Sequence, residues 1–102
     1  MSGRLAAVAV SATTETTVYT VPALKVATCT LSLCNRTSDN ITVRVAIATS
    51  ATATTGEWIE YGATLPGNGV LERSALVLDA TQRLNIYASA AGVSAVVYGF
   101  EE

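Results

Sequence analysis

Alternation of apolar and polar side chains is the feature that most limits what this chain can fold into, and it is clearest over Val26–Ala48. Two alternating runs there flank the turn-forming residues Thr37–Asn40, a pattern typical of a β-hairpin. Successive side chains of a strand point to opposite faces, so each run has one face to bury. We therefore predict a hairpin over Val26–Ala48, with Cys34 and Arg44 on its outward face. Its apolar face comprises Ala27, Cys29, Leu31, Leu33, Ile41, Val43, Val45 and Ile47.

Short segments of the same kind recur along the chain and are separated by turn residues. Further strands are predicted at Arg4–Val10, Thr16–Val21, Glu57–Tyr61, Val70–Leu78, Arg83–Ser89 and Val93–Phe100. The segment Thr49–Gly56 has no periodicity and predicts a long projecting loop. About eight short strands at this spacing, without helical periodicity, indicate a sandwich or barrel. We predict an all-β fold, a single antiparallel β-sandwich domain over residues 1–102, Ig-like or jelly-roll-like.

The small share of charged residues in the sequence indicates which kinds of partner the chain can have. Charged residues make up 14% of the sequence, against about 25% in ordinary soluble domains, and Thr, Ser and Ala replace them. Exposed apolar area usually marks an interface, so we expect neighbouring subunits to cover much of the surface. The six basic residues are scattered singly, which argues against a nucleic-acid partner. No apolar run approaches the roughly 20 residues of a membrane span, so no membrane association is predicted.

The two cysteines differ in their predicted surroundings. Cys29 lies on the apolar face of its run and Cys34 on the opposite one. Residues five apart on a strand are about 16 Å apart, whereas a disulfide needs Cα atoms within about 7 Å. We therefore predict no bridge between them. Cys29 is interpreted as a buried small hydrophobe, and Cys34 as a free thiol or a link between subunits.

Catalytic and metal-binding residue patterns are missing from the sequence. It contains no histidine, the usual general base and the commonest zinc ligand. Glu57 and Glu60 flank Trp58, but positions three apart on a strand point to opposite faces. These carboxylates are predicted to be solvated edge residues. We predict neither an enzyme nor a bound cofactor or metal.

Aromatic residues offer the remaining functional signal. Most are predicted to pack in the core or at subunit interfaces, and the segment Val93–Phe100, apolar on both faces, is predicted to be a central or interface strand. An alternative is a carbohydrate platform formed by the Thr49–Tyr61 loop and strand around Trp58, since lectin domains are often β-sandwiches. The predicted interface residues are Cys34, Arg36, Arg44, Trp58, Tyr61, Tyr98 and Phe100.

Several segments together resemble a family of small structural proteins of tailed bacteriophages. They are Val18-Tyr-Thr-Val-Pro-Ala23, Cys34-Asn-Arg36, Val43-Arg-Val-Ala-Ile47, Leu65-Pro-Gly-Asn-Gly-Val-Leu-Glu72 and Leu78-Asp-Ala-Thr-Gln82. The resemblance covers about residues 16–100. The chain departs from the family pattern at Leu24-Lys25, where many relatives have glycine, which suggests a different local turn.

This resemblance implies a function as well as a fold. Family members are virion structural proteins with β-sandwich folds, so the expected role is a capsid decoration or cement protein assembled in the host cytoplasm. The expected partners are other virion proteins, the major capsid protein or tail proteins, and other copies of the chain, in a trimer for example. A tail, neck or baseplate accessory and a module that binds host-surface carbohydrate are the alternatives.

Overall fold

The computed structural model describes residues 2–102 and contains eight strands there. They are β1 (Ser2–Val10), β2 (Thr16–Thr20), β3 (Ala27–Asn35), β4 (Ile41–Ala48), β5 (Trp58–Leu65), β6 (Val70–Leu78), β7 (Arg83–Ala88) and β8 (Val93–Glu101). A single 3₁₀ turn, η1 (Thr55–Glu57), precedes β5. Most bounds agree with the predicted strands to within one or two residues, and β5 extends four residues beyond its predicted end at Tyr61.

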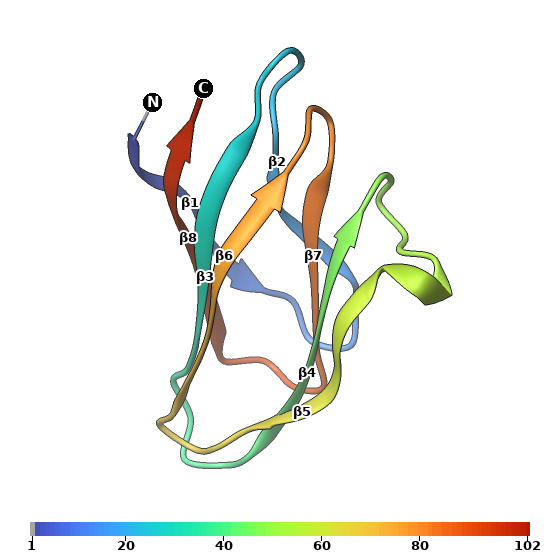
Figure 1. The fold of residues 1–102 in the computed structure, drawn as a ribbon. Coiled ribbons are helices and arrows are strands. Elements are labelled where there is room, and N and C mark those ends of the chain that lie inside the picture. Colours follow the sequence, from blue (N-terminus) through green and yellow to red (C-terminus); the bar gives the residue numbers. More distant parts are fainter. Residues whose placement is uncertain (1) are drawn as a thin grey trace.

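The strands form two four-stranded sheets that pack face to face (Figure 1). Sheet A has the order β1-β8-β3-β6, and sheet B has the order β2-β7-β4-β5. All strand ladders are antiparallel, and β4 pairs with β5, β3 with β6, β2 with β7 and β1 with β8. One long hairpin rolled into two sheets produces this nested order, which is that of a jelly roll. The predicted antiparallel β-sandwich is therefore confirmed.

The hairpin predicted over Val26–Ala48 is wrong. Strand β3 belongs to sheet A and pairs with β6 and β8, whereas β4 belongs to sheet B and pairs with β5 and β7. The residues between the two strands cross from one sheet to the other. The two apolar faces pack toward each other across the core instead of lying side by side, since that buries both. Cys34 and Arg44 consequently lie on opposite faces of the molecule.

A buried asparagine holds the crossing from sheet A to sheet B. Asn35, the last residue of β3, is 1% exposed. Its Nδ2 donates to the carbonyl oxygens of Asp39, Leu65 and Pro66 at 2.7–3.1 Å. Its Oδ1 accepts from the backbone N–H and the hydroxyl of Thr37, at 2.9 and 2.7 Å. Because buried polar groups must be paired, this residue joins the crossing to the β5–β6 turn.

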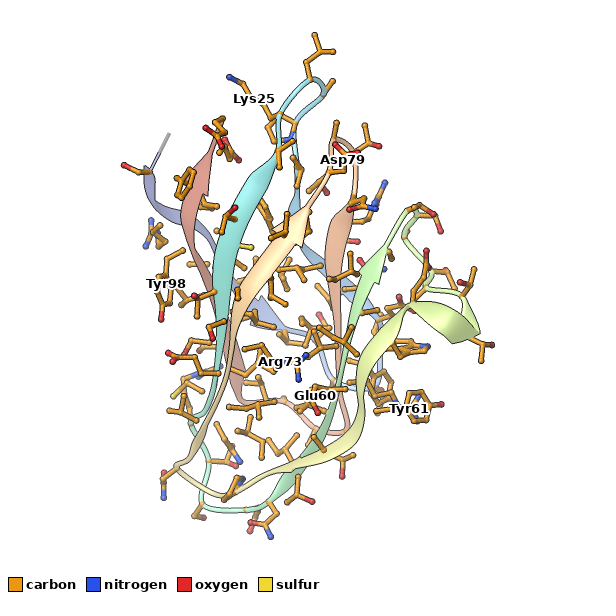
Figure 2. All side chains as sticks on the ribbon, in the orientation of Figure 1. Lys25, Glu60, Tyr61, Arg73, Asp79 and Tyr98 are labelled. Atoms are coloured by element: carbon orange, nitrogen blue, oxygen red, sulfur yellow. The ribbon has the colours of Figure 1, made fainter. Side chains whose placement is uncertain are left out.

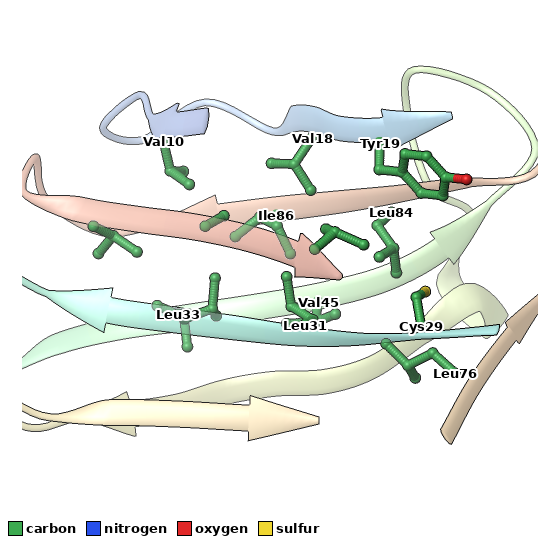
Figure 3. Close-up of a cluster of buried hydrophobic side chains, with 14 of the residues drawn as sticks. Val10, Val18, Tyr19, Cys29, Leu31, Leu33, Val45, Leu76, Leu84 and Ile86 are labelled. Atoms are coloured by element: carbon green, nitrogen blue, oxygen red, sulfur yellow. The ribbon is translucent and has the colours of Figure 1, made fainter. Parts of the chain in front are cut away.

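The core lies between the sheets and is formed by the side chains that alternation assigned to it (Figure 3). Ala27, Cys29, Leu31 and Leu33 are each at most 3% exposed. β8 is a central strand, between β1 and β3, as predicted. At one end, the Tyr19 hydroxyl donates to the carboxylate of Glu101, which links sheet B to sheet A. Burial first, and this carboxylate second, raise the pKa of Tyr19 far above its usual value of 10.

One side of the sandwich is closed by an ion pair (Figure 2). The register of β3 against β6 shifts between Cys29 and Leu31, so that Arg73 lies opposite Leu31 and shares its inward face. Arg73 Nη1 contacts Glu60 Oε2 of β5 at 2.9 Å. Glu60 is thus a partly buried ion-pair partner, which corrects the prediction of a solvated edge residue. Glu57 lies in η1 and is not part of the strand.

Candidate binding face on sheet B

Three long side chains form a row across the outward face of sheet B. Arg44 of β4 lies opposite Tyr87 of β7 on one side and Tyr61 of β5 on the other. Directly opposed residues share a face of the sheet, so the three side chains meet. We call them the Tyr–Arg–Tyr row. The sequence singled out Arg44 and Tyr61 but not Tyr87, because nothing in the sequence shows which strands are neighbours.

The arginine of this row is held between two aromatic rings. Its Cζ lies 4.3 Å from the ring centroid of Tyr61 and 4.6 Å from that of Tyr87. Both distances are within the range of cation–π contacts. The Arg44 Nε is buried without a hydrogen-bond partner, and no salt bridge to Arg44 occurs among residues 2–102. The guanidinium is therefore held by the two tyrosine rings that stack on its faces, and no carboxylate of the described residues neutralises its charge.

A β-bulge adds the tryptophan to the same surface. Trp58 lies opposite Ala46 and Tyr61 opposite Arg44, with a register shift between the two pairs. Strict alternation would place residues three apart on opposite faces, but the extra residue of a bulge reverses the parity. The two rings meet edge to face, with centroids 5.6 Å apart and an interplanar angle of 72°. The bulge thus extends the Tyr–Arg–Tyr row into a surface with three aromatic rings.

An open depression lies beside these rings. It has a volume of about 450 Å³ and is lined by Thr55, Trp58 and Tyr61. Tyr61 is 66% exposed and points away from the body of the sandwich (Figure 2). The turn η1 forms one wall, and the Glu57 carboxylate stabilises it by accepting the backbone N–H of Thr54 at 2.8 Å. The size suits a small-molecule ligand.

A second buried asparagine ties the β4–β5 connection onto sheet B. Asn85 of β7 is completely buried although it lies on the outward face. Its Nδ2 donates to the carbonyl oxygens of Ser50 and Ala51 at 3.0 and 3.2 Å, and to Glu15 Oε2 at 2.8 Å. Glu15 Oε2 also accepts the backbone N–H of Ala53. The loop predicted to project therefore does so only near η1, because its first half is held against the sheet (Figure 1).

The remaining predicted interface residues lie on the opposite face, that of sheet A. Tyr98 and Phe100 of β8 are 40% and 44% exposed, and Val77 of β6 is 62% exposed. Tyr98 donates its hydroxyl to Glu72 Oε2 at 2.9 Å, and this hydrogen bond raises the pKa of Tyr98. Arg36 donates from Nε to the Ser94 hydroxyl at 2.7 Å. Only Tyr19 among the six aromatic residues is buried in the core.

The cysteines lie on the two sides of β3 that parity predicted. Cys29 is buried and Cys34 is half-buried, and both are free thiols. Burial raises the pKa of the Cys29 thiol. Within residues 2–102, no three metal-ligating side chains gather into a group that could hold an ion. The same residues include no helix of the length and hydropathy needed to cross a membrane.

Comparisons with protein-family models, with curated proteins and with solved structures found no match to the chain. The resemblance to phage structural proteins therefore stays a prediction that rests on the sequence segments alone. The arrangement of the two outer faces is what remains to support a function.

Proposed function

We propose that the chain is a non-enzymatic structural protein of a bacteriophage virion, a capsid decoration or cement protein that stabilises the particle through protein–protein contacts. The outward face of sheet A is the observation that carries the proposal. It exposes Val70, Val77, Tyr98 and Phe100 on two strands, and the strand between them presents Thr, Ser and Cys side chains. An exposed apolar area with few charges fits a subunit contact.

The fold is consistent with this role by analogy alone. Jelly rolls occur in viral capsid proteins and in lectins, and a fold does not determine a function. The proposed partners are major capsid protein subunits and further copies of the chain, with a trimer as the form to test first. The proposed location is the assembled particle. A tail, neck or baseplate accessory would use the same face of sheet A.

Particle binding tests the proposal directly. A reconstruction of purified virions should contain density for this sandwich on the capsid, with sheet A against its neighbour. The double variant Val77→Asp with Phe100→Asp should fold and fail to join particles, because it places charge in the contact. Thr64→Asp, an exposed position on sheet B, is the matched control and should still bind. Density on the tail would favour the accessory role, and absence from the particle would refute a virion role.

A module that binds host-surface carbohydrate is the second candidate function. The depression beside Trp58 and Tyr61 is the observation that favours it. Aromatic walls with a few polar groups are typical of small-ligand sites. This site lies on sheet B, so it leaves the face of sheet A free for a neighbour. The two functions are therefore compatible in one chain.

A further inference from the structure

Arg44 presents a cationic edge that nothing in the described chain neutralises. The two faces of the guanidinium are covered by Tyr61 and Tyr87, and its Nε is buried, so the N–H groups of its two Nη atoms remain for another molecule. Those donors form a planar fork that matches the two oxygens of a carboxylate. An arginine held in this way is preorganised, because the stacking has already restricted its rotamers.

The acidic side chains of the surrounding elements are engaged elsewhere. Glu15 accepts hydrogen bonds from Asn85 and from the backbone of Ala53. Glu57 accepts the Thr54 N–H within its own turn, and Glu60 pairs with Arg73 on the inward side of β5. None of the three pairs with Arg44. A ligand that brings a carboxylate would supply the missing partner.

The depression next to the Tyr–Arg–Tyr row has the shape and lining for a sugar ring. At about 450 Å³ it falls within the range of 300–1,000 Å³ that small-ligand sites occupy. Two aromatic rings set at 72° provide one face and one edge for the apolar C–H surface of a pyranose. Thr55, a residue with a hydroxyl group, also lines the wall. Tyr61 belongs to both features, because it lines the depression and covers one face of Arg44.

We infer that this surface binds an acidic saccharide, whose ring packs on Trp58 and Tyr61 while its carboxylate pairs with Arg44. The inference deepens the carbohydrate-binding candidate function and rests on it. A single cation matches a singly charged carboxylated sugar. The Asn85 contacts that hold the loop in place keep the wall of the depression in position before the ligand arrives.

Tryptophan fluorescence provides the direct test, since Trp58 is the only tryptophan in the chain. The probes are 3′-sialyllactose with its methyl ester as the neutral match, and trigalacturonic acid with its methyl ester as a second pair. Each acidic probe should change the emission in a saturable way. Each neutral probe should bind at least tenfold more weakly, because it retains the ring and lacks the charge.

Two arginine variants on the same face separate the role of Arg44 from general electrostatics. Arg44→Met keeps the aliphatic stem and should weaken binding of the acidic probes at least tenfold, to the level of the neutral ones. Arg83→Met removes an outward arginine farther along β7 and should leave the affinity unchanged. Circular dichroism confirms that both variants fold. Trp58→Phe, measured by calorimetry, should weaken acidic and neutral probes alike.

Each outcome has a defined meaning. Equal binding of acidic and neutral probes, with Arg44→Met unaffected, would overturn the acidic specificity and leave the carbohydrate candidate standing. No saturable binding of any probe at millimolar concentration would overturn both. The virion role is tested independently by particle binding through sheet A.

Discussion

The outer faces of the two sheets are built in different ways. Sheet B carries a loop held down by Asn85 and a row of stacked side chains around Arg44. Sheet A has no such cover among the described residues, and it exposes Val77 of β6 and Phe100 of β8, on the two sides of β3. A face whose side chains are fixed by hydrogen bonds and stacking is suited to a small ligand. A bare face with little charge offers area for a macromolecular contact.

The two faces also depend on different atoms. In sheet A the backbones approach closely at Gly99, where φ is +150° and an added Cβ would lie 2.2 Å from the carbonyl oxygen of Thr28. In sheet B the outer layer depends on side-chain amides and guanidinium groups. Substitutions that separate backbone packing from side-chain contacts should therefore affect the two faces differently.

Gly99→Ala should give the largest effect. The added methyl group meets backbone atoms of β3 that cannot move without breaking the ladder, and the positive φ disfavours an L side chain. We expect the free energy of unfolding to fall by about 3 kcal/mol or more, measured by urea denaturation. Gly56→Ala is the control, since a Cβ there meets nothing within 4 Å, and its stability should stay within about 0.5 kcal/mol of the parent. Equal effects would show that Gly99 is not a close-approach site.

Asn85→Ala should come next and should change sheet B alone. It leaves the carbonyl oxygens of Ser50 and Ala51 without their donor, at a cost of about 2–3 kcal/mol in the free energy of unfolding. The released loop should also make Trp58 more accessible to acrylamide. Asn40→Ala, which removes one exposed hydrogen bond to Gly67, should cost less than about 1 kcal/mol. Unchanged quenching of Trp58 would contradict the role of Asn85 as the anchor of the loop.

Alkaline pH should weaken the link between the sheets at Tyr19. The folded pKa of Tyr19 is raised, so its contribution is complete below the unfolded pKa of about 10 and is lost as the pH rises toward the folded value. Above pH 10, stability should fall by up to about 1.4 kcal/mol per pH unit from this group.

Tyr19→Phe removes that part of the pH dependence. Urea denaturation at pH 8, 10 and 11 should show a smaller loss for the variant than for the parent, although the ionisation of Cys29, whose pKa is raised by burial, contributes to both profiles. Tyr98→Phe should give a weaker change in the same direction, because solvent screens its exposed contact with Glu72. An identical pH profile for the parent and Tyr19→Phe would contradict the assignment.

Arg44→Met should have the smallest effect on folding. Each of the two cation–π contacts contributes about 0.5–1 kcal/mol at a partly exposed site, but the variant also removes the buried, unpaired Nε, whose burial is unfavourable. The free energy of unfolding should therefore fall by less than about 1 kcal/mol. A loss above about 2 kcal/mol would mean that the Tyr–Arg–Tyr row is chiefly a structural element of sheet B. Thermal and urea denaturation of the ligand-free variant measure this directly.

Side-chain parity, strand positions and the charge-poor surface could be predicted from the sequence. The burial of Leu31, Leu33 and Val45 could be predicted because alternation assigns each residue of a strand to one face, whichever strands are its neighbours. Which strands pair is a different matter. The sequence of the β3–β4 connection is compatible with a hairpin or with a crossing between sheets. The crossing forms because it buries the apolar faces of β3 and β4 against each other, whereas a hairpin would pair the edges of the two strands.

The binding face depends on features that alternation cannot reveal. Trp58 and Tyr61 share a face only because of a bulge, and Tyr87 meets Arg44 through strand neighbours far apart in the sequence. Asn85 occupies a polar position that is usually exposed on an amphipathic strand, and its burial depends on the loop that folds over it. Each of these is a tertiary effect without a local sequence signal.

Nested strand pairing sets an order of assembly along the chain. The β4–β5 pair closes the shortest loop, and the pairs β3–β6, β2–β7 and β1–β8 require successively longer ones. Loop-closure entropy grows with length, and distant contacts slow folding. Folding should therefore start at the β4–β5 pair, which carries Arg44, Trp58 and Tyr61, and finish with β1, whose amides should exchange with solvent first.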